Sequence, residues 1–173
     1  MRASTPWVGV YRVNSLLGVG GMGTVYEASA PDGTRVALKV IKDDYARDET
    51  FQREARIAQT ISNPYVVAAL DTGEQDGIPN LAERFVDGGS LEQKLKRDGR
   101  LDLPTTVRIC AEVAEGLQAL WAGGMVHRDV KPGNILLDDA GAHTSPTSVW
   151  PRQRGQRPDD ARTGAWVDGL HGA

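Results

Sequence analysis

Short segments in which apolar and polar residues alternate dominate the first half of the chain. Five such segments, separated by turn residues, are predicted to be strands: residues 11–17, 23–29, 34–41, 63–77 and 79–86. In the third segment Val36, Leu38 and Val40 fall on one face, while Ala37 and Lys39 fall on the other. Short turns between neighbouring strands favour a mostly antiparallel sheet.

Helical periodicity replaces this alternation in three places, residues 49–61, 89–99 and 103–124. In the first, apolar residues recur at spacings of three or four: Phe51, Ala55, Ala58 and Ile61. Ser90 is the expected N-cap of the second helix. Pro104 fits the first turn of the third helix, and Gly123 and Gly124 fit its end.

The third helix carries one apolar stripe: Val107, Cys110, Ala114, Leu117 and Leu120. Cys110 is the single cysteine, so an intramolecular disulfide framework is excluded. Its apolar neighbours predict that it is a small core residue.

The order of the elements, strands first and helices after, favours an α+β fold with two lobes. We expect a leader at residues 1–10, a sheet lobe at about 11–86 and the start of a helical lobe at 87–141. Residues 142–173 contain few aliphatic residues and many prolines and glycines. That composition is typical of disorder, because too little surface is buried to offset the entropy of ordering.

Charge and hydropathy narrow the class of protein. The formal net charge of −3 gives no support for a nucleic-acid partner or a polybasic membrane role, since both depend on clustered Lys and Arg. The first residues lack the apolar stretch of a signal peptide, and no segment reaches the ~20 apolar residues of a membrane span. We therefore expect a soluble cytoplasmic protein.

Three glycines with the spacing G-x-G-x-x-G stand at Gly18, Gly20 and Gly23. A dinucleotide-binding site needs a helix after such glycines, whereas Thr24 and the residues after it predict a strand. The glycines therefore predict a hairpin, either a plain flexible one or one whose backbone N–H groups approach phosphate oxygens.

Lys39 lies in the next predicted strand, between apolar neighbours. A lone strand lysine is usually a solvated residue, but this one follows a phosphate-type loop, so a charge partner is expected. Glu54, in the first predicted helix, is the candidate partner, and an ordinary exposed helix glutamate is the alternative.

The stretch HRDVKPGN, residues 127–134, places Asp129, Lys131 and Asn134 in a tight turn. Phosphoryl transfer needs an oriented hydroxyl, metal ions and cations on the transferring group, and a carboxylate, a lysine and an amide supply those parts. The alternative is a polar loop between a helix and a strand.

With these motifs in this order, residues 11–141 resemble the protein kinases, most closely the bacterial serine/threonine kinases of eukaryotic type. The resemblance implies a protein-kinase-like fold with an antiparallel sheet in the first lobe. It also implies ATP and Mg²⁺ as cofactors, and protein Ser/Thr hydroxyls as substrates.

The resemblance implies a role for each motif residue. ATP would lie against Lys39, its partner Glu54 and the glycine hairpin: Leu17, Gly18, Val19, Gly20, Gly21, Met22, Gly23 and Val25. Backbone groups of Arg84 and Val86 would bind adenine. Asp129 would accept the hydroxyl proton, Lys131 would touch the γ-phosphate and Asn134 would bind Mg²⁺.

The chain departs from the family pattern at two places. Glu83 stands where an apolar residue is expected behind the adenine, and burying its carboxylate is costly unless it is paired. The neighbouring Arg84 points the other way along a strand, so it is a poor partner. The second metal-binding motif, D-F-G, does not follow residue 137.

These departures leave three interpretations of function. The first is a serine/threonine protein kinase, inactive in this truncated form. The second is a non-catalytic, pseudokinase-like fragment that binds nucleotide or a partner. The third is a degraded gene product with no folded role.

In the kinase family, later helices normally cover the helix at 104–122. Without them, we expect its stripe of Val107, Cys110, Leu117 and Leu120 to face water.

The tail itself suggests a cause for the missing motif. Read one base out of frame, the codons of residues 143–151 permit the sequence HFADFGLA, so we expect residues 142–173 to be an out-of-frame translation caused by one deleted base near codon 142. Sequencing the DNA across codons 138–165 tests this hypothesis. Codons that cannot spell Asp-Phe-Gly in the shifted frame would end it.

Overall fold

The computed structural model describes residues 7–20, 23–42, 49–138 and 143–144, and for residues 49–54 it describes the backbone alone. The expected disordered tail therefore lies outside the described residues, except for two of its members. His143–Thr144 form the short strand β8, which pairs antiparallel with β7, Leu136–Leu137.

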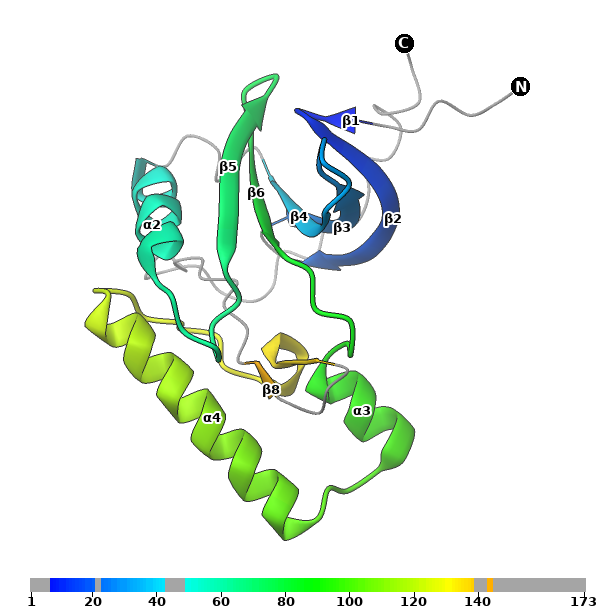
Figure 1. The fold of residues 1–173 in the computed structure, drawn as a ribbon, viewed down its shortest axis with the longest axis vertical. Helices are drawn as coiled ribbons and strands as arrows, with labels where there is room; N and C mark the ends of the chain where they lie inside the picture. Colours follow the sequence, from blue (N-terminus) through cyan, green and yellow to red (C-terminus); the bar gives the residue numbers. More distant parts are fainter. Residues whose placement is uncertain (1–6, 21–22, 43–48, 139–142, 145–173) are drawn as a thin grey trace.

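A six-stranded sheet forms the first lobe, in the order β1-β2-β3-β4-β6-β5 (Figure 1). Every neighbouring pair is antiparallel, as the alternation predicts. The strands are β1 Trp7–Val8, β2 Tyr11–Gly20, β3 Gly23–Ser29, β4 Arg35–Ile41, β5 Ala69–Gln75 and β6 Ile78–Arg84.

The sheet is larger than the sequence predicts at two points. Val8 is buried in the core and pairs with Tyr11, so residues 7 and 8 belong to the sheet and not to a loose leader. β2 continues to Gly20, which pairs with Gly23, so the glycines are part of the paired strands. Pairing extends further than alternation predicts because glycines carry no side chain that would signal a face.

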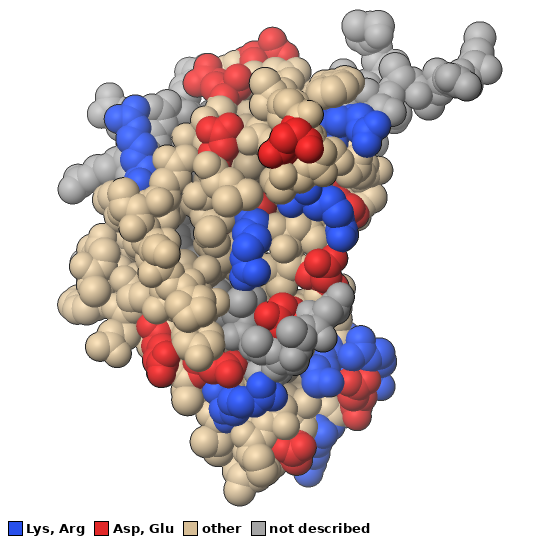
Figure 2. Space-filling model, in the orientation of Figure 1, with Lys and Arg blue, Asp and Glu red and all other residues tan. Residues whose placement is uncertain are grey.

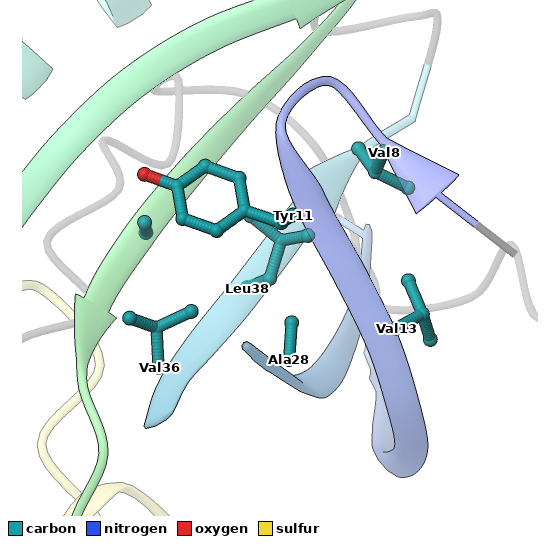
Figure 3. Close-up of a cluster of buried hydrophobic side chains, with 7 residues drawn as sticks. Val8, Tyr11, Val13, Ala28, Val36 and Leu38 are labelled. Carbon is teal, nitrogen blue, oxygen red and sulfur yellow. The ribbon is translucent and has the colours of Figure 1, made fainter. Parts of the chain in front are cut away.

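One face of the sheet is closed by a cluster of small and branched side chains (Figure 3). Its members come from β1, β2, β3, β4 and β6: Val8, Tyr11, Val13, Ala28, Val36, Leu38 and Ala82. The Tyr11 hydroxyl donates to a carboxylate oxygen of Asp71 on β5, at 2.8 Å. This bond links β2 to β5, the edge strand at the far side of the sheet.

Three helices follow the predicted pattern: α2 Glu49–Thr60, α3 Leu91–Asp98 and α4 Leu103–Ala122. Ser90 caps α3 as predicted, in a capping box with Gln93. α2 lies beside β5, while α3 and α4 form the lower part of the molecule in Figure 1. None of the helices in the described ranges combines the length and apolar character needed to cross a membrane.

The apolar stripe of α4 is partly exposed. Val107 and Cys110 face water as expected for an uncovered stripe, so Cys110 is not the small core residue that its apolar neighbours predict. Leu120 is buried and Leu117 is half-buried, against the expectation that they face water. Leu120 packs in a cluster with residues of α2, and Ile109 packs in one with residues of α3, which covers this side of the helix.

We expect Tyr11→Phe to lower the free energy of unfolding by about 1 kcal/mol near pH 7, because it leaves Asp71 without this donor. Burial, followed by the Asp71 hydrogen bond, raises the pKa of Tyr11 to about 12. The phenol's contribution is complete below the unfolded pKa near 10 and is lost as the pH rises through about 12. The stability gap between wild type and variant, measured by urea denaturation, should therefore narrow above pH 10. A gap that stays constant up to the alkaline end would contradict this assignment.

Candidate active site

Asp129 lies at the centre of a polar cluster in the loop after α4. Its Oδ2 accepts from the Lys131 Nζ at 2.8 Å and from the Asn134 Nδ2 at 3.0 Å. The same Asn134 amide also donates to the Asp129 backbone carbonyl at 2.7 Å. The structure therefore brings together the three residues that the sequence singled out in this loop, and it fixes the carboxylate by two donors.

A strained turn precedes this carboxylate. The backbone N–H of Asp129 donates to the His127 carbonyl at 2.8 Å, and the intervening Arg128 has a φ of 61°. Non-glycine residues rarely adopt a positive φ, and such residues cluster at functional sites. His127 is buried, and its Nδ1 also accepts from the Asp129 N–H at 3.3 Å. The turn therefore determines the direction in which Asp129 leaves the backbone.

Backbone contacts hold the catalytic loop against the segment that follows β6. Leu91 N–H donates to the Ile135 carbonyl at 2.7 Å, and Leu137 N–H donates to the Gly89 carbonyl at 2.8 Å. At Gly88 a Cβ would lie 2.2 Å from the Leu137 carbonyl oxygen, so this approach requires glycine. The short helix η1, Pro132–Asn134, packs on α3 at this junction.

Lys39 lies on the sheet face opposite the cluster of Figure 3. It is paired with Val25 on β3 and with Leu81 on β6, and it is 7% exposed. Burial lowers the pKa of its ammonium group, and the charges of Glu83 and Asp129 oppose that shift. Lys39 is thus close enough to the catalytic loop to interact with Asp129, although it comes from the other lobe.

Glu83 is also 7% exposed, on the same sheet face as Lys39. Burial raises the pKa of its carboxyl group, and the Lys39 charge opposes that shift. Lys39 is therefore the opposite charge that acts on this carboxyl group, although no ion pair or hydrogen bond joins these two described side chains. The side chain of Glu54, the partner predicted from the sequence, lies outside the described residues.

The glycine hairpin is confirmed as a strand–turn–strand unit, with Gly21 and Met22 outside the described residues. A Cβ at Gly23 would lie 2.1 Å from the Val40 carbonyl oxygen, so glycine is required there by the protein itself. Among the described residues, Gly18 and Gly20 have no positive φ and no atom closer than 3.8 Å to a hypothetical Cβ. Neither backbone conformation nor packing of the described residues explains these two glycines.

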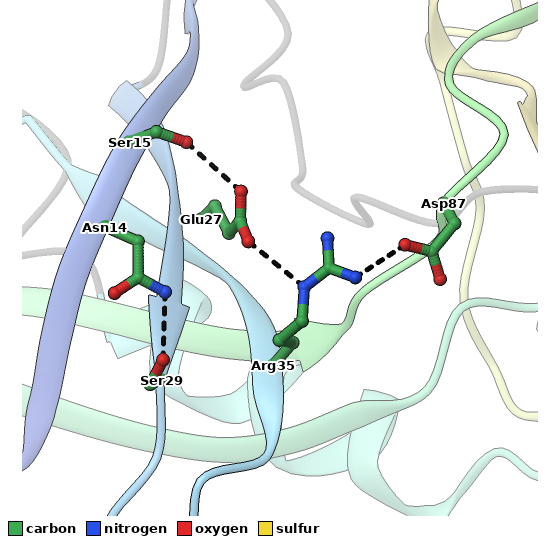
Figure 4. Close-up of polar contacts among 6 residues, drawn as sticks. All are labelled: Asn14, Ser15, Glu27, Ser29, Arg35 and Asp87. Atoms are coloured by element: carbon green, nitrogen blue, oxygen red, sulfur yellow. Dashed lines mark hydrogen bonds and ion pairs between the residues drawn. The ribbon is translucent and has the colours of Figure 1, made fainter.

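Arg35 ties the end of β6 to the sheet (Figure 4). Its guanidinium donates to Glu27 at 3.0 Å and to Asp87 at 2.7 Å, and it lies 4.2 Å from the centre of the Phe85 ring. The segment it holds includes Arg84 and Val86, the two residues expected at the adenine. The Arg84 N–H donates to the Ala68 carbonyl at 2.9 Å, so that group is engaged within the protein.

Sequence reasoning missed the proximity of Glu83 to Lys39 and the contacts of Arg35. Alternation shows which residues of one strand share a face, because residues two apart point the same way, but not which strands lie side by side. The missing information was the pairing of β4 with β6, which alternation within each strand does not specify.

Two further observations concern charge and metal ligands. Basic and acidic side chains are interspersed over the face shown in Figure 2. Within the described part of the chain, no group of three or more His, Cys, Asp or Glu side chains is placed to hold a metal ion.

Comparison with known proteins identifies this arrangement. The profile of the protein kinase domain matches residues 11–144. The chain belongs to the protein kinase domain family. The predicted α+β fold with an antiparallel sheet in the first lobe is confirmed by solved kinase domains of the same architecture.

The related proteins are bacterial serine/threonine kinases, as the resemblance implies. Serine/threonine-protein kinase PknH of Mycobacterium bovis is 44% identical over 135 residues, which cover 75% of this chain and 22% of that protein. AfsK of Streptomyces coelicolor is 36% identical over 138 residues, covering 78% of this chain and 17% of that protein. The crystal structure of the Mycobacterium tuberculosis PknI kinase domain superposes with a TM-score of 0.70 at 30% identity, covering 84% of this chain and 62% of that one.

The matched region is thus about a fifth of the length of these curated relatives. It comprises the sheet lobe with its glycine hairpin, and the loop of residues 127–134.

We expect Asn134→Ala to lower the free energy of unfolding by about 1–2 kcal/mol, because it removes two hydrogen bonds that fix the loop around Asp129. Asn14→Ala is the matched control, since the exposed Asn14 amide makes one bond, to the Ser29 hydroxyl. It should cost less than about 0.5 kcal/mol. Equal costs in chemical denaturation would show that Asn134 does not stabilise the loop.

Proposed function

We propose that this chain binds ATP between the glycine hairpin and Lys39, and that it derives from a kinase that phosphorylates Ser/Thr hydroxyls of proteins. One observation carries the proposal: the Asp129 carboxylate, fixed by Lys131 and Asn134, acts on the buried Lys39 of the other lobe. A reaction that consumes ATP places the domain in the cytoplasm, where ATP is available.

The phosphates would lie under the hairpin. The room above Gly18 and Gly20 allows backbone N–H groups to approach phosphate oxygens, and the Lys39 ammonium would neutralise the α- and β-phosphates. Val25, which is paired with Lys39, would cover the base. Leu17, Val19, Gly21, Met22 and Gly23 would complete the cover, and Glu54 would be a second partner of Lys39.

The base would lie against the segment after β6. Because the Arg84 N–H is engaged with Ala68, adenine would depend on the other backbone groups of Arg84 and Val86. Arg35 would hold this segment at a fixed distance from β4.

Asp129 would act as the base. The substrate hydroxyl oxygen forms a bond to the γ-phosphorus, the bond from that phosphorus to the bridging oxygen of ADP breaks, and the hydroxyl proton passes to Asp129. Lys131 donates to the Asp129 carboxylate and would share its charge with the transferred phosphoryl group.

Mg²⁺ would supply positive charge on the ATP phosphates. Because the Asn134 amide nitrogen is turned to Asp129, its carbonyl oxygen is the ligand that this loop offers. Mg²⁺ takes oxygen ligands and often keeps several waters and substrate phosphates, so one amide oxygen fits part of its coordination shell. The protein would therefore bind the ion mainly together with ATP.

A second candidate function is nucleotide binding without turnover. Glu83 favours it, because a carboxyl group stands where the family pattern has an apolar residue behind the adenine, and D-F-G does not follow residue 137.

For this 173-residue polypeptide tested by itself, we expect ATP with Mg²⁺ to raise the melting temperature, with negligible phosphate transfer to a generic protein substrate. Lys39→Met should abolish the rise, because it removes the phosphate-binding charge. Lys96→Met is the matched control, since the Lys96 side chain is 73% exposed on α3. Thermal melting with and without ATP, together with radiolabel transfer, measures both quantities.

The outcomes separate the two candidates. A melting shift without transfer favours nucleotide binding alone for this polypeptide. Robust transfer that is lost in Asp129→Asn would establish catalysis by it. A melting temperature that ATP does not change, in wild type and Lys39→Met alike, would overturn the proposed nucleotide site.

A further inference from the structure

We propose that Glu83 is a positioning residue for Lys39, whose positive charge it supports in the nucleotide site from within the sheet itself. The role of Lys39 toward phosphate rests on the proposed function. The electrostatic interaction between the two side chains does not, and it can be measured without nucleotide.

The strand pairing carries the geometry of this proposal. Glu83 on β6 lies directly opposite Ala37 on β4, and Lys39 is two residues further along β4 on the same face. Diagonal neighbours of this kind are separated by about 7–8 Å between backbone positions, which long side chains can span. The register therefore places the Glu83 and Lys39 charges near each other on one face of the sheet, independently of any helix.

The burial of both side chains strengthens the electrostatic interaction between the Lys39 and Glu83 charges. Each side chain belongs to a residue that is only 7% exposed. A buried charge is costly unless an opposite charge compensates it, and removing one member of a buried pair leaves the other uncompensated.

Among the described residues, Lys39 is the cation whose charge acts on Glu83. Arg35, also on this face of β4, is engaged with Glu27 and Asp87. Asp71 on β5 is bonded to Tyr11 at the cluster on the opposite face. The Asp129 carboxylate, in the loop after α4, also acts on Lys39. The side chains of residues 49–54 of α2 lie outside the described part of the chain, so the contribution of Glu54 is measured with its own variant.

Glu83, on the sheet, therefore supports the positive charge of Lys39, in addition to any effect of Glu54 on α2. Burial lowers the pKa of Lys39 while Glu83 raises it, so loss of the Glu83 charge should lower that pKa further. The ammonium group would then be lost at a lower pH, and phosphate binding with it.

The direct test is an NMR titration of the Lys39 side-chain nitrogen in the full 173-residue chain, with Lys39→Met used to assign the signal. We expect Glu83→Gln to lower the Lys39 pKa by about one unit or more, and Glu83→Asp to restore most of the shift. Glu74→Gln, at an exposed position of β5, is the matched control and should leave the Lys39 pKa unchanged. A change in the Lys39 pKa of less than about 0.3 units in Glu83→Gln would overturn the proposal, because removal of a distant surface charge has a similarly small effect.

A reciprocal measurement covers the case in which Glu83→Gln does not fold. Lys39→Met should raise the pKa of the Glu83 carboxyl, followed by carbon NMR, because it removes the charge that opposes the effect of burial. An unchanged Glu83 pKa in that variant would contradict the proposed interaction between Lys39 and Glu83. Glu54→Gln separates the two carboxylates: a Lys39 pKa that responds to Glu54→Gln and not to Glu83→Gln assigns the lysine to the helix and overturns the proposal.

ATP affinity then separates this inference from the proposed function. Glu83→Gln should weaken ATP binding up to about tenfold at alkaline pH and much less at acidic pH, where Lys39 stays charged. Wild-type chain that fails to bind ATP would overturn the proposed function, while the NMR titration would still decide the role of Glu83.

Discussion

The antiparallel pairing of β4 with β6 is the constraint on which the site depends. It sets Lys39 opposite Leu81 and diagonal to Glu83, and so places two opposite charges in a buried position. The same pairing brings Arg35 to Phe85 and Asp87, where the chain leaves the sheet. A shift of this register by one residue would move Lys39 to the face occupied by the apolar cluster, where its charge would lack a partner.

A second constraint joins the sheet to the catalytic loop. The close approach of Gly88 to the Leu137 carbonyl, with the backbone bonds of Gly89 and Leu91, docks the loop on the segment that continues β6. Asp129 and Lys39 are ninety residues apart in the chain, yet their charges interact through this docking. The strained backbone at Arg128 persists because the surrounding bonds hold it there.

Much of the fold and part of the site were predictable from the sequence. The strands, the helix caps and the hairpin followed from alternation, Ser90 and the residues after Gly23, because these features depend on local backbone preferences. The sequence predicted the exposure of Val107 and Cys110 on α4, but not the burial of Ile109 and Leu120. Which face is buried depends on where α2 and α3 lie.

The sequence by itself determined the family and the catalytic loop, since the spacing of Asp129, Lys131 and Asn134 is local and a short loop brings such residues together in any case. Only the tertiary structure decided which charges share a buried environment. Lys39 and Glu83 come from strands separated along the chain. Their proximity depends on strand order and register, which are set by the packing of the whole sheet.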